Sequence, residues 1–335
     1  MCAERVALPA LPRRAAWAKL FVHPMQNSAL ESGPADAGSH AHAVSLSQAA
    51  RRSLTGALLV AGSALCFGAL PIFARAAYAD GVDPRTLLLL RFTLASAFLW
   101  ALVAVRRAPL PRGRPLAVLV AMGGIGYAGQ AFSYFTALTL ASAGLVALLL
   151  YLFPALVALI ARFVLGHPLS RLQLFAIAMA LAGSVLTIGR AGDGTPLGVF
   201  FGLLAAVIYS VYITVGSRLP PLSATATSAV VTTSAAAVYG VAALATGVRL
   251  PATAAGWAAV LAVAVVGTVL AISLFFAGLE RIGPVRTSIY STLEPAFTLL
   301  LAVIFLGEGV TPSRAAGGAL ILAAVVLLAR AEARP

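Results

Sequence analysis

The chain has 335 residues, of which 61% are hydrophobic and only 10% are charged, and its mean hydropathy is +0.99. This composition excludes a soluble domain and is typical of a polytopic helical membrane protein. The net charge of +13 does not indicate nucleic-acid binding, because the arginines occur singly or in pairs between apolar segments. Cys2 and Cys66 are too few for a disulfide framework or a metal site, and we expect no metal and no cofactor.

Residues 1–53 differ from the rest of the chain, with mixed charges and a run rich in Ser, Ala, Gly and Pro. We expect a disordered cytoplasmic tail. No apolar segment with a cleavage site precedes the first span, which argues against a secretory signal. His23, His40 and His42 lack the spacing of a zinc site. A start codon placed too early is an alternative origin of this segment.

Ten hydrophobic segments follow, each close to the ~20 residues that a helix needs to cross a bilayer. The connections between them are short, which favours a compact all-α bundle. We predict the spans at 54–78, 87–105, 115–138, 143–164, 172–189, 195–217, 224–246, 255–279, 285–306 and 313–330.

Prolines interrupt two of the early spans. Pro71 should kink the first span and release the carbonyl of Phe67, and Pro154 should do the same in the fourth span. Breaks of this kind line cavities or act as hinges. Phe67 is therefore a candidate for the apolar wall of a binding cavity.

Arg91 is a charge inside the second span. It is close enough to the outer end to snorkel outward, as is Arg75 at the end of the first span. The alternatives are that Arg91 pairs with Glu294 or Glu308, or that it binds a substrate carboxylate.

Aromatic and polar side chains recur at helical spacing in several spans. Most of them are tyrosines, for which packing with the hydroxyl on a carbonyl is the simpler alternative. A largely aromatic cavity with few polar groups suits small amphipathic metabolites. The candidates are Tyr127, Gln130 and Tyr134 in the third span, Tyr151 in the fourth, Tyr209 and Tyr212 in the sixth, Phe275 in the eighth and Tyr290 in the ninth.

The ninth span contains an acid, Glu294, near its middle. An acid at that depth costs about 2.5–3.5 kcal/mol on insertion scales, which the apolar residues of the segment offset. Thr287, Ser291 and Thr298 share a helical stripe with it, and Pro295 frees the carbonyl of Ser291. We interpret this seam as part of a solute pathway, with a buried Glu that only pairs with a neighbouring helix as the alternative.

Small-residue ridges lie on the fifth and tenth spans. We expect both to pack inside the bundle, and a dimer face is the alternative, so the protein is a monomer or a homodimer. The ridges are Ala176, Ala180 and Ser184, and Ala315, Ala319 and Ala323.

The positive-inside rule places both termini in the cytoplasm. In that orientation thirteen arginines lie inside and four outside. The inside set is Arg51, Arg52, Arg106, Arg107, Arg112, Arg114, Arg162, Arg171, Arg218, Arg281, Arg286, Arg330 and Arg334, and the outside set is Arg85, Arg190, Arg249 and Arg314.

The two halves of the chain match when Pro154 is aligned with Pro295. The segments 134–138 and 165–167 then lie on 275–279 and 306–308. Each half has five spans, an odd number, so the halves are inverted in the membrane. Inverted repeats are typical of alternating-access transporters, whose substrate site lies near the midplane.

A set of short motifs recurs in order along both halves: Arg91-Phe92, Tyr134, Ala137-Leu138, Leu152-Phe153-Pro154, Leu165-Gly166, Leu293-Glu294-Pro295 and Leu306-Gly307-Glu308. With these motifs the chain resembles the ten-helix EamA-type transporters of the drug/metabolite transporter superfamily. The resemblance covers residues 54–189 and 195–330 and departs from the family at His167, where the first repeat often has Glu. We interpret His167 as a tolerated loop change, with pH sensing as the alternative.

The resemblance implies a secondary transporter of the cell inner membrane that moves a small organic metabolite, often an amino acid or related compound and often by export. Protons are the candidate coupling ion, and Glu294, the only acid deep in a span, is their candidate carrier. Uncoupled facilitation by the same fold is the alternative. An intramembrane enzyme is disfavoured because the spans contain no G-x-S-x-G and no H-E-x-x-H. The substrate, the direction and the coupling ion stay open.

Overall fold

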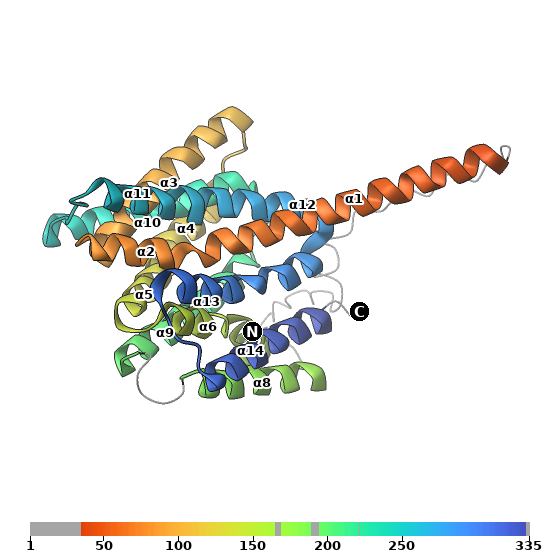
Figure 1. Ribbon diagram of the computed structural model, residues 1–335. Coiled ribbons are helices and arrows are strands. Elements are labelled where there is room, and N and C mark those ends of the chain that lie inside the picture. Colours follow the sequence, from red (N-terminus) through yellow and green to blue (C-terminus); the bar gives the residue numbers. More distant parts are fainter. Residues whose placement is uncertain (1–34, 165–168, 189–193, 221, 333–335) are drawn as a thin grey trace, which may run out of the picture. The chain divides into compact units, whose positions relative to one another are not determined.

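The computed structural model describes residues 35–164, 169–188, 194–220 and 222–332 (Figure 1). The chain divides into two compact units, Met1–Gln48 and Ala49–Pro335, and apart from the start of helix α1 every feature described below belongs to the second. Helix α1 (Ala35–Gly68) begins before the predicted first span. His167 and residues 1–34 lie outside the described ranges, so the predictions for them stay predictions.

The described part of the chain contains helices and no strand, which confirms the all-α fold class. Nine of its helical segments are long and apolar enough to cross a membrane, and Arg171–Leu186 is a shorter apolar helix, which agrees with about ten spans. The elements after α1 are α2 (Leu70–Ala79), α3 (Pro84–Arg106), α4 (Gly113–Ala121), η2 (Met122–Tyr127), α5 (Ala128–Leu140), α6 (Ala143–Leu150), α7 (Phe153–Phe163), α8 (Arg171–Ile188), α9 (Pro196–Gly216), α10 (Ala224–Thr246), α11 (Ala254–Ala264), η3 (Val265–Leu270), α12 (Ala271–Ser291), α13 (Leu293–Leu306) and α14 (Pro312–Glu332).

Three spans are broken near a proline. Pro71 lies in the first turn of α2 and Pro154 in the first turn of α7, which confirms the kinks predicted in the first and fourth spans. The ninth span breaks in the same way between α12 and α13, just before Pro295. Because proline has no backbone N–H, each break leaves a carbonyl available to another partner.

The third and eighth spans each contain a π-helical turn. The turns are η2 and η3, and they lie at nearly corresponding positions when Pro154 is aligned with Pro295. A π-helical turn inserts a residue and re-aims the side chains around it, and such turns often occur at functional sites. The two halves therefore share irregular backbone features as well as their number of spans.

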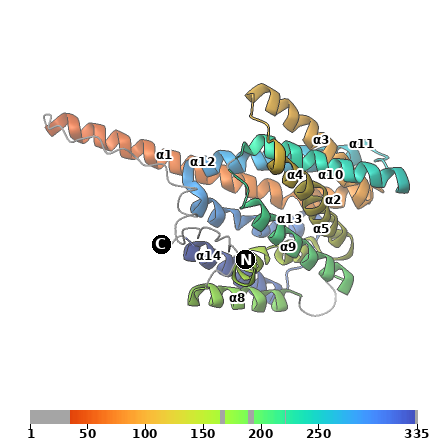
Figure 2. The same cartoon turned by 180° about the vertical axis from the view of Figure 1, so that it is seen from behind.

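Helix packing follows the small residues. Figures 1 and 2 show α8 beside α14, and a Cβ added at Gly183 of α8 would lie 2.7 Å from the carbonyl oxygen of Gly317 in α14. The ridge of Ala176, Ala180 and Ser184 is buried as predicted. The prediction for the tenth span is wrong, because α14 buries the face with Gly317, Gly318 and Ile321 instead. The residues left exposed are Ala315, Ala319 and Ala323.

Candidate solute-binding site

The breaks in the fourth and ninth spans meet at a tyrosine. The hydroxyl of Tyr151, which lies between α6 and α7, is 2.7 Å from the carbonyl oxygen of Ser291 and 3.0 Å from Oε2 of Glu294. The Ser291 carbonyl is the one that Pro295 leaves free of a helical partner. Tyr151 is 6% exposed, so this contact joins the two repeats inside the protein.

The break in the first span packs against the same place. A Cβ added at Gly68 would lie 2.9 Å from the Glu294 carbonyl oxygen and 3.0 Å from Cβ of Phe297, so a larger residue would push α13 away. Three broken spans therefore meet at the first turn of α13. The side chain of Glu294 is partly buried there.

A row of aromatic rings runs from this junction to Arg91. Tyr151 contacts Phe153 (ring centroids 5.9 Å apart), and Phe153 contacts Tyr209 (4.8 Å). Tyr209 stacks on Tyr212 (6.3 Å), as their shared helix face predicts, and Tyr212 contacts Tyr127 (6.0 Å). The Tyr127 hydroxyl then accepts a hydrogen bond from Nη2 of Arg91 (3.4 Å), so the row of rings runs from Glu294 to Arg91.

Arg91 is held inside the protein, and the expectation that it snorkels outward is wrong. It is 4% exposed, its Nε donates to Oγ1 of Thr268 (2.9 Å), and its guanidinium lies over the rings of Phe92 (5.3 Å) and Phe135 (5.2 Å). Hydrogen bonds and two aromatic faces replace the water that snorkelling would provide.

The alternative that Arg91 pairs with an acid is also wrong. Across the described ranges the one ion pair within 4.0 Å joins Arg75 to Glu308. Among the described residues Arg91 thus has no carboxylate partner, and a substrate carboxylate stays a proposal for that role.

The predicted residues of the third span, Tyr134 and Gln130, are both 8% exposed on α5. The Tyr134 ring contacts Phe135, with ring centroids 5.6 Å apart. Both predicted side chains are therefore buried inside the protein, and their roles in binding stay predictions.

The predicted polar seam on the ninth span is less available than expected. Thr287 and Thr298 are each 1% exposed, and their hydroxyls donate to the carbonyl oxygens of Gly283 (2.8 Å) and Glu294 (3.1 Å). The Ser291 hydroxyl likewise donates to the Thr287 carbonyl (2.9 Å). Each of these hydroxyls therefore donates to a backbone carbonyl four residues earlier in the chain, so its proton is not free to bind a solute.

The structure does not join the remaining candidates to the Glu294–Tyr151 contact. Tyr290 is exposed (38%), whereas Phe67 packs against the hydrophobic core. Phe275 contacts Phe276 with ring centroids 5.5 Å apart. Their roles in binding stay predictions.

Sequence reasoning missed Thr268, and the repeat contained the signal for it. Aligning Pro154 with Pro295 places Tyr127 on Thr268, and both residues bind Arg91. The π-helical turn η3 orients Thr268, whose hydroxyl donates to the carbonyl of Val263 (2.9 Å), five residues earlier. Two positions related by the internal repeat thus hold one arginine.

Fold and site together define a multi-pass membrane protein built from two related halves that meet at a charged, aromatic centre. The EamA-like transporter family matches residues 54–189 and 196–330, and the chain belongs to that family, as its sequence resemblance predicts. It is therefore a membrane transporter.

Individual relatives agree with this assignment. The chain is 27% identical over 284 residues to the uncharacterized transporter YcbK of Bacillus subtilis strain 168, covering 77% of this chain and 87% of YcbK. A solved crystal structure is 25% identical and superimposes with a TM-score of 0.60, covering 81% of this chain and 97% of that one.

Proposed function

We propose that the protein is a secondary transporter of the cell inner membrane that moves a small organic metabolite by alternating access between its two repeats. The observation that carries the proposal is the hydrogen bond from Tyr151 in the first repeat to Glu294 in the second. Any movement of one repeat against the other changes this contact. A site that both repeats build is what alternating access requires.

The geometry suits Glu294 as a proton carrier. The Tyr151 hydroxyl has one proton and two acceptors within reach, the Ser291 carbonyl and the Glu294 carboxylate. When Glu294 is ionised, Tyr151 donates to it. When Glu294 is protonated, Tyr151 donates to Ser291 and accepts from the acid. Both protonation states of Glu294 are thus satisfied without rearrangement of the backbone.

The two charges favour a zwitterionic or amphipathic metabolite, such as an amino acid or a related compound. Glu294 attracts an ammonium group, Arg91 attracts a carboxylate, and the aromatic row between them provides apolar contact. We further propose that transport runs outward. Uncoupled facilitation through the same site is the alternative, and dependence on a pH gradient separates the two.

We also propose that both termini are cytoplasmic, that the domains are 54–189 and 195–330, and that these are inverted repeats. The distribution of arginines and the odd number of spans in each half support this.

The role of Glu294 is testable with Glu294→Gln. A thermal-shift screen of metabolites first identifies a ligand, whose uptake is then measured in proteoliposomes that contain a pH-sensitive dye. We expect the variant to bind the ligand but to lose the proton flux that accompanies transport. Tyr151→Phe should reduce coupled transport roughly 10- to 100-fold, because the acid loses its hydrogen-bond partner.

Glu280→Gln, an identical change at an exposed position of α12, is the matched control and should behave as the wild type. Proton flux that persists in Glu294→Gln contradicts the proton-carrier role. Loss of ligand binding would instead assign Glu294 to the substrate, and loss of folding would make it structural.

A further inference from the structure

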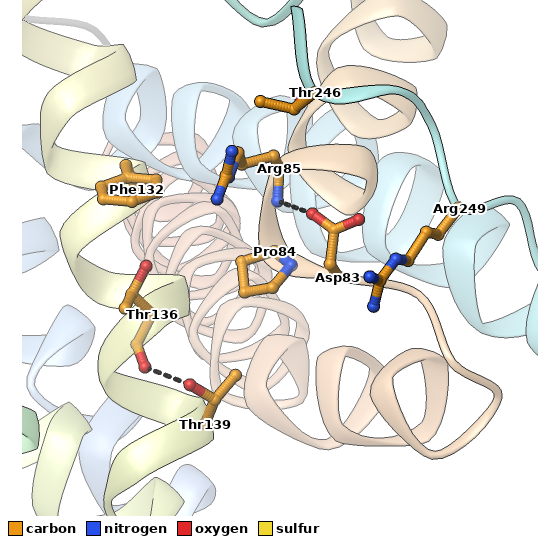
Figure 3. A pocket seen from close by; sticks show the side chains of 8 residues that line it. All are labelled: Asp83, Pro84, Arg85, Phe132, Thr136, Thr139, Thr246 and Arg249. Carbon is orange, nitrogen blue, oxygen red and sulfur yellow. Dashed lines mark hydrogen bonds between the residues drawn. The ribbon is translucent and has the colours of Figure 1, made fainter. Parts of the chain in front are cut away.

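A polar cavity separate from the Glu294–Tyr151 contact lies where α3 begins and α5 ends (Figure 3). Its volume is about 340 Å³, within the size range of small-molecule sites. We call it the α3–α5 cavity. Its lining residues are Asp83, Pro84, Arg85, Phe132, Thr136, Thr139, Thr246 and Arg249.

Two arginines line this cavity, and both are exposed. Figure 3 shows Arg85 and Arg249 on opposite sides of Asp83. Within the described ranges neither guanidinium takes part in an ion pair or a side-chain hydrogen bond. Both groups are therefore available to a ligand that enters the cavity.

The one acid of the cavity is engaged with the backbone. Oδ1 of Asp83 accepts hydrogen bonds from the amides of Arg85 (2.9 Å) and Thr86 (3.2 Å), and Oδ2 accepts from the Thr86 hydroxyl (2.8 Å). Asp83 thus caps α3. Its single negative charge leaves the cavity with a net positive charge.

One wall of the cavity is held in place by a hydrogen bond between the two repeats. The Arg249 amide donates to the hydroxyl of Thr86 (3.1 Å), which is 3% exposed, so the loop after α10 is attached to the start of α3. On the opposite wall, Oγ1 of Thr136 is buried and has no hydrogen-bond partner among the described residues. A buried hydroxyl without a partner is costly unless a ligand or water reaches it.

We propose that the α3–α5 cavity binds the carboxylate of a small organic acid. Guanidinium groups bind carboxylates through paired, charge-assisted hydrogen bonds, and two of them face this volume. The Thr139 hydroxyl already donates to the Thr136 carbonyl (2.8 Å, Figure 3), so the two arginines are the donors for the carboxylate. The ring of Phe132 provides an apolar contact for the rest of the ligand. The inference does not rest on the proposed transport function, because its test measures binding alone.

The test uses 4-fluorobenzoate as the probe and 4-fluorobenzamide as its uncharged isostere, observed by ¹⁹F NMR with the full-length protein in phosphatidylcholine nanodiscs. We expect the benzoate signal to broaden and shift on binding and the benzamide signal to change much less. In the double variant Arg85→Gln, Arg249→Gln the affinity for benzoate should fall about tenfold or more, because both charge-assisted contacts are lost. Equal binding of the two probes, or unchanged affinity in the double variant, overturns the proposal.

Two controls locate the probe. Arg106→Gln removes an exposed arginine at the opposite end of α3 and should leave the affinity unchanged. Loss of benzoate affinity in Arg91→Gln, with none in the double variant, would place the probe beside Arg91 and overturn the inference. Addition of phosphatidylglycerol should not displace benzoate, and displacement would assign the two arginines to lipid headgroups instead. The unfolding temperature of each variant confirms that it is folded.

Discussion

The buried arginine shows how single residues make a charge tolerable inside a membrane protein. Arg91 has a hydroxyl acceptor at 2.9 Å on Thr268 and a second one on Tyr127, and its guanidinium lies over the rings of Phe92 and Phe135. Each interaction is worth about 0.5–2 kcal/mol in a site without water, so their sum offsets much of the charge penalty. The guanidinium is planar and carries several donors, so it can use all four partners at once.

A double-mutant cycle tests the contact between Arg91 and Thr268. Thr268→Val removes the acceptor and should lower the stability of the wild type by about 1–2 kcal/mol. In an Arg91→Met background the same change should have a much smaller effect, because there is no donor left to satisfy. Thermal unfolding of the four proteins in nanodiscs measures this coupling. Equal effects of Thr268→Val in both backgrounds would contradict the assigned contact.

At the scale of elements, helix ends are capped by residues from the other repeat. Glu308, which follows α13, accepts hydrogen bonds from the amides of Ala143 (2.6 Å) and Gly144 (3.1 Å) at the start of α6. Asp80, which follows α2, accepts from the Thr253 amide (3.1 Å) and hydroxyl (2.8 Å) at the start of α11. An acid is favoured at both places because a helix N-terminus presents free N–H groups and positive partial charge. These caps tie the halves together at their ends.

The cap at α11 makes stability depend on pH. Hydrogen bonds from Thr253, the backbone amide first and the hydroxyl second, lower the pKa of Asp80 from its ordinary value of 3.8. The ionised form therefore stabilises the fold above that value, and the contribution is lost as the pH falls through the lower pKa of the folded state. We expect Asp80→Asn to lower the unfolding temperature at pH 7 but to have progressively less effect below about pH 4.

Unfolding temperatures across this pH range, with Glu280→Gln as a control at an exposed acid, measure the effect. A difference between Asp80→Asn and the wild type that stays constant down to pH 2 would mean that the Asp80 carboxylate does not act through its charge.

On the scale of the whole molecule, the two halves share their backbone but not their chemistry. Prolines break both central spans, and both preceding spans contain a π-helical turn. The side chains at matching positions differ, since Phe153 corresponds to Glu294 and Tyr127 to Thr268. The repeated backbone brings corresponding positions together. Because the side chains at these positions differ, the centre contains one carboxylate, Glu294, one cation, Arg91, and a row of aromatic rings.

The proposed orientation is testable with single cysteines in a Cys2→Ser, Cys66→Ser background. Arg249→Cys lies in the loop after α10 and Ser217→Cys at the end of α9, and both positions are exposed. We expect a membrane-impermeant maleimide to label position 249, but not position 217, in intact cells, because the positive-inside rule places them on opposite sides. Labelling of position 217 alone would reverse the orientation.

The fold was predictable from the sequence because hydropathy is a local property. A segment such as 224–246 is long and apolar enough to span a membrane wherever it packs, and α10 has these same bounds. Prolines act on their own helix in the same way, so the breaks at Pro71 and Pro154 were predictable. Which face of a helix packs against a neighbour depends on the rest of the fold and not on the helix alone. The ridge of Ala315, Ala319 and Ala323 therefore could not show that α14 buries its other face.

The sequence by itself determined the class of the protein, its two repeats and the candidate acid Glu294, because composition, periodicity and internal alignment need no knowledge of contacts. Only the tertiary structure decided which groups complete the site. It placed Tyr151 against Glu294 and Thr268 against Arg91, and it left Arg85 and Arg249 facing the α3–α5 cavity. These pairings join residues far apart in the chain, and they depend on how broken and π-bulged helices aim their side chains.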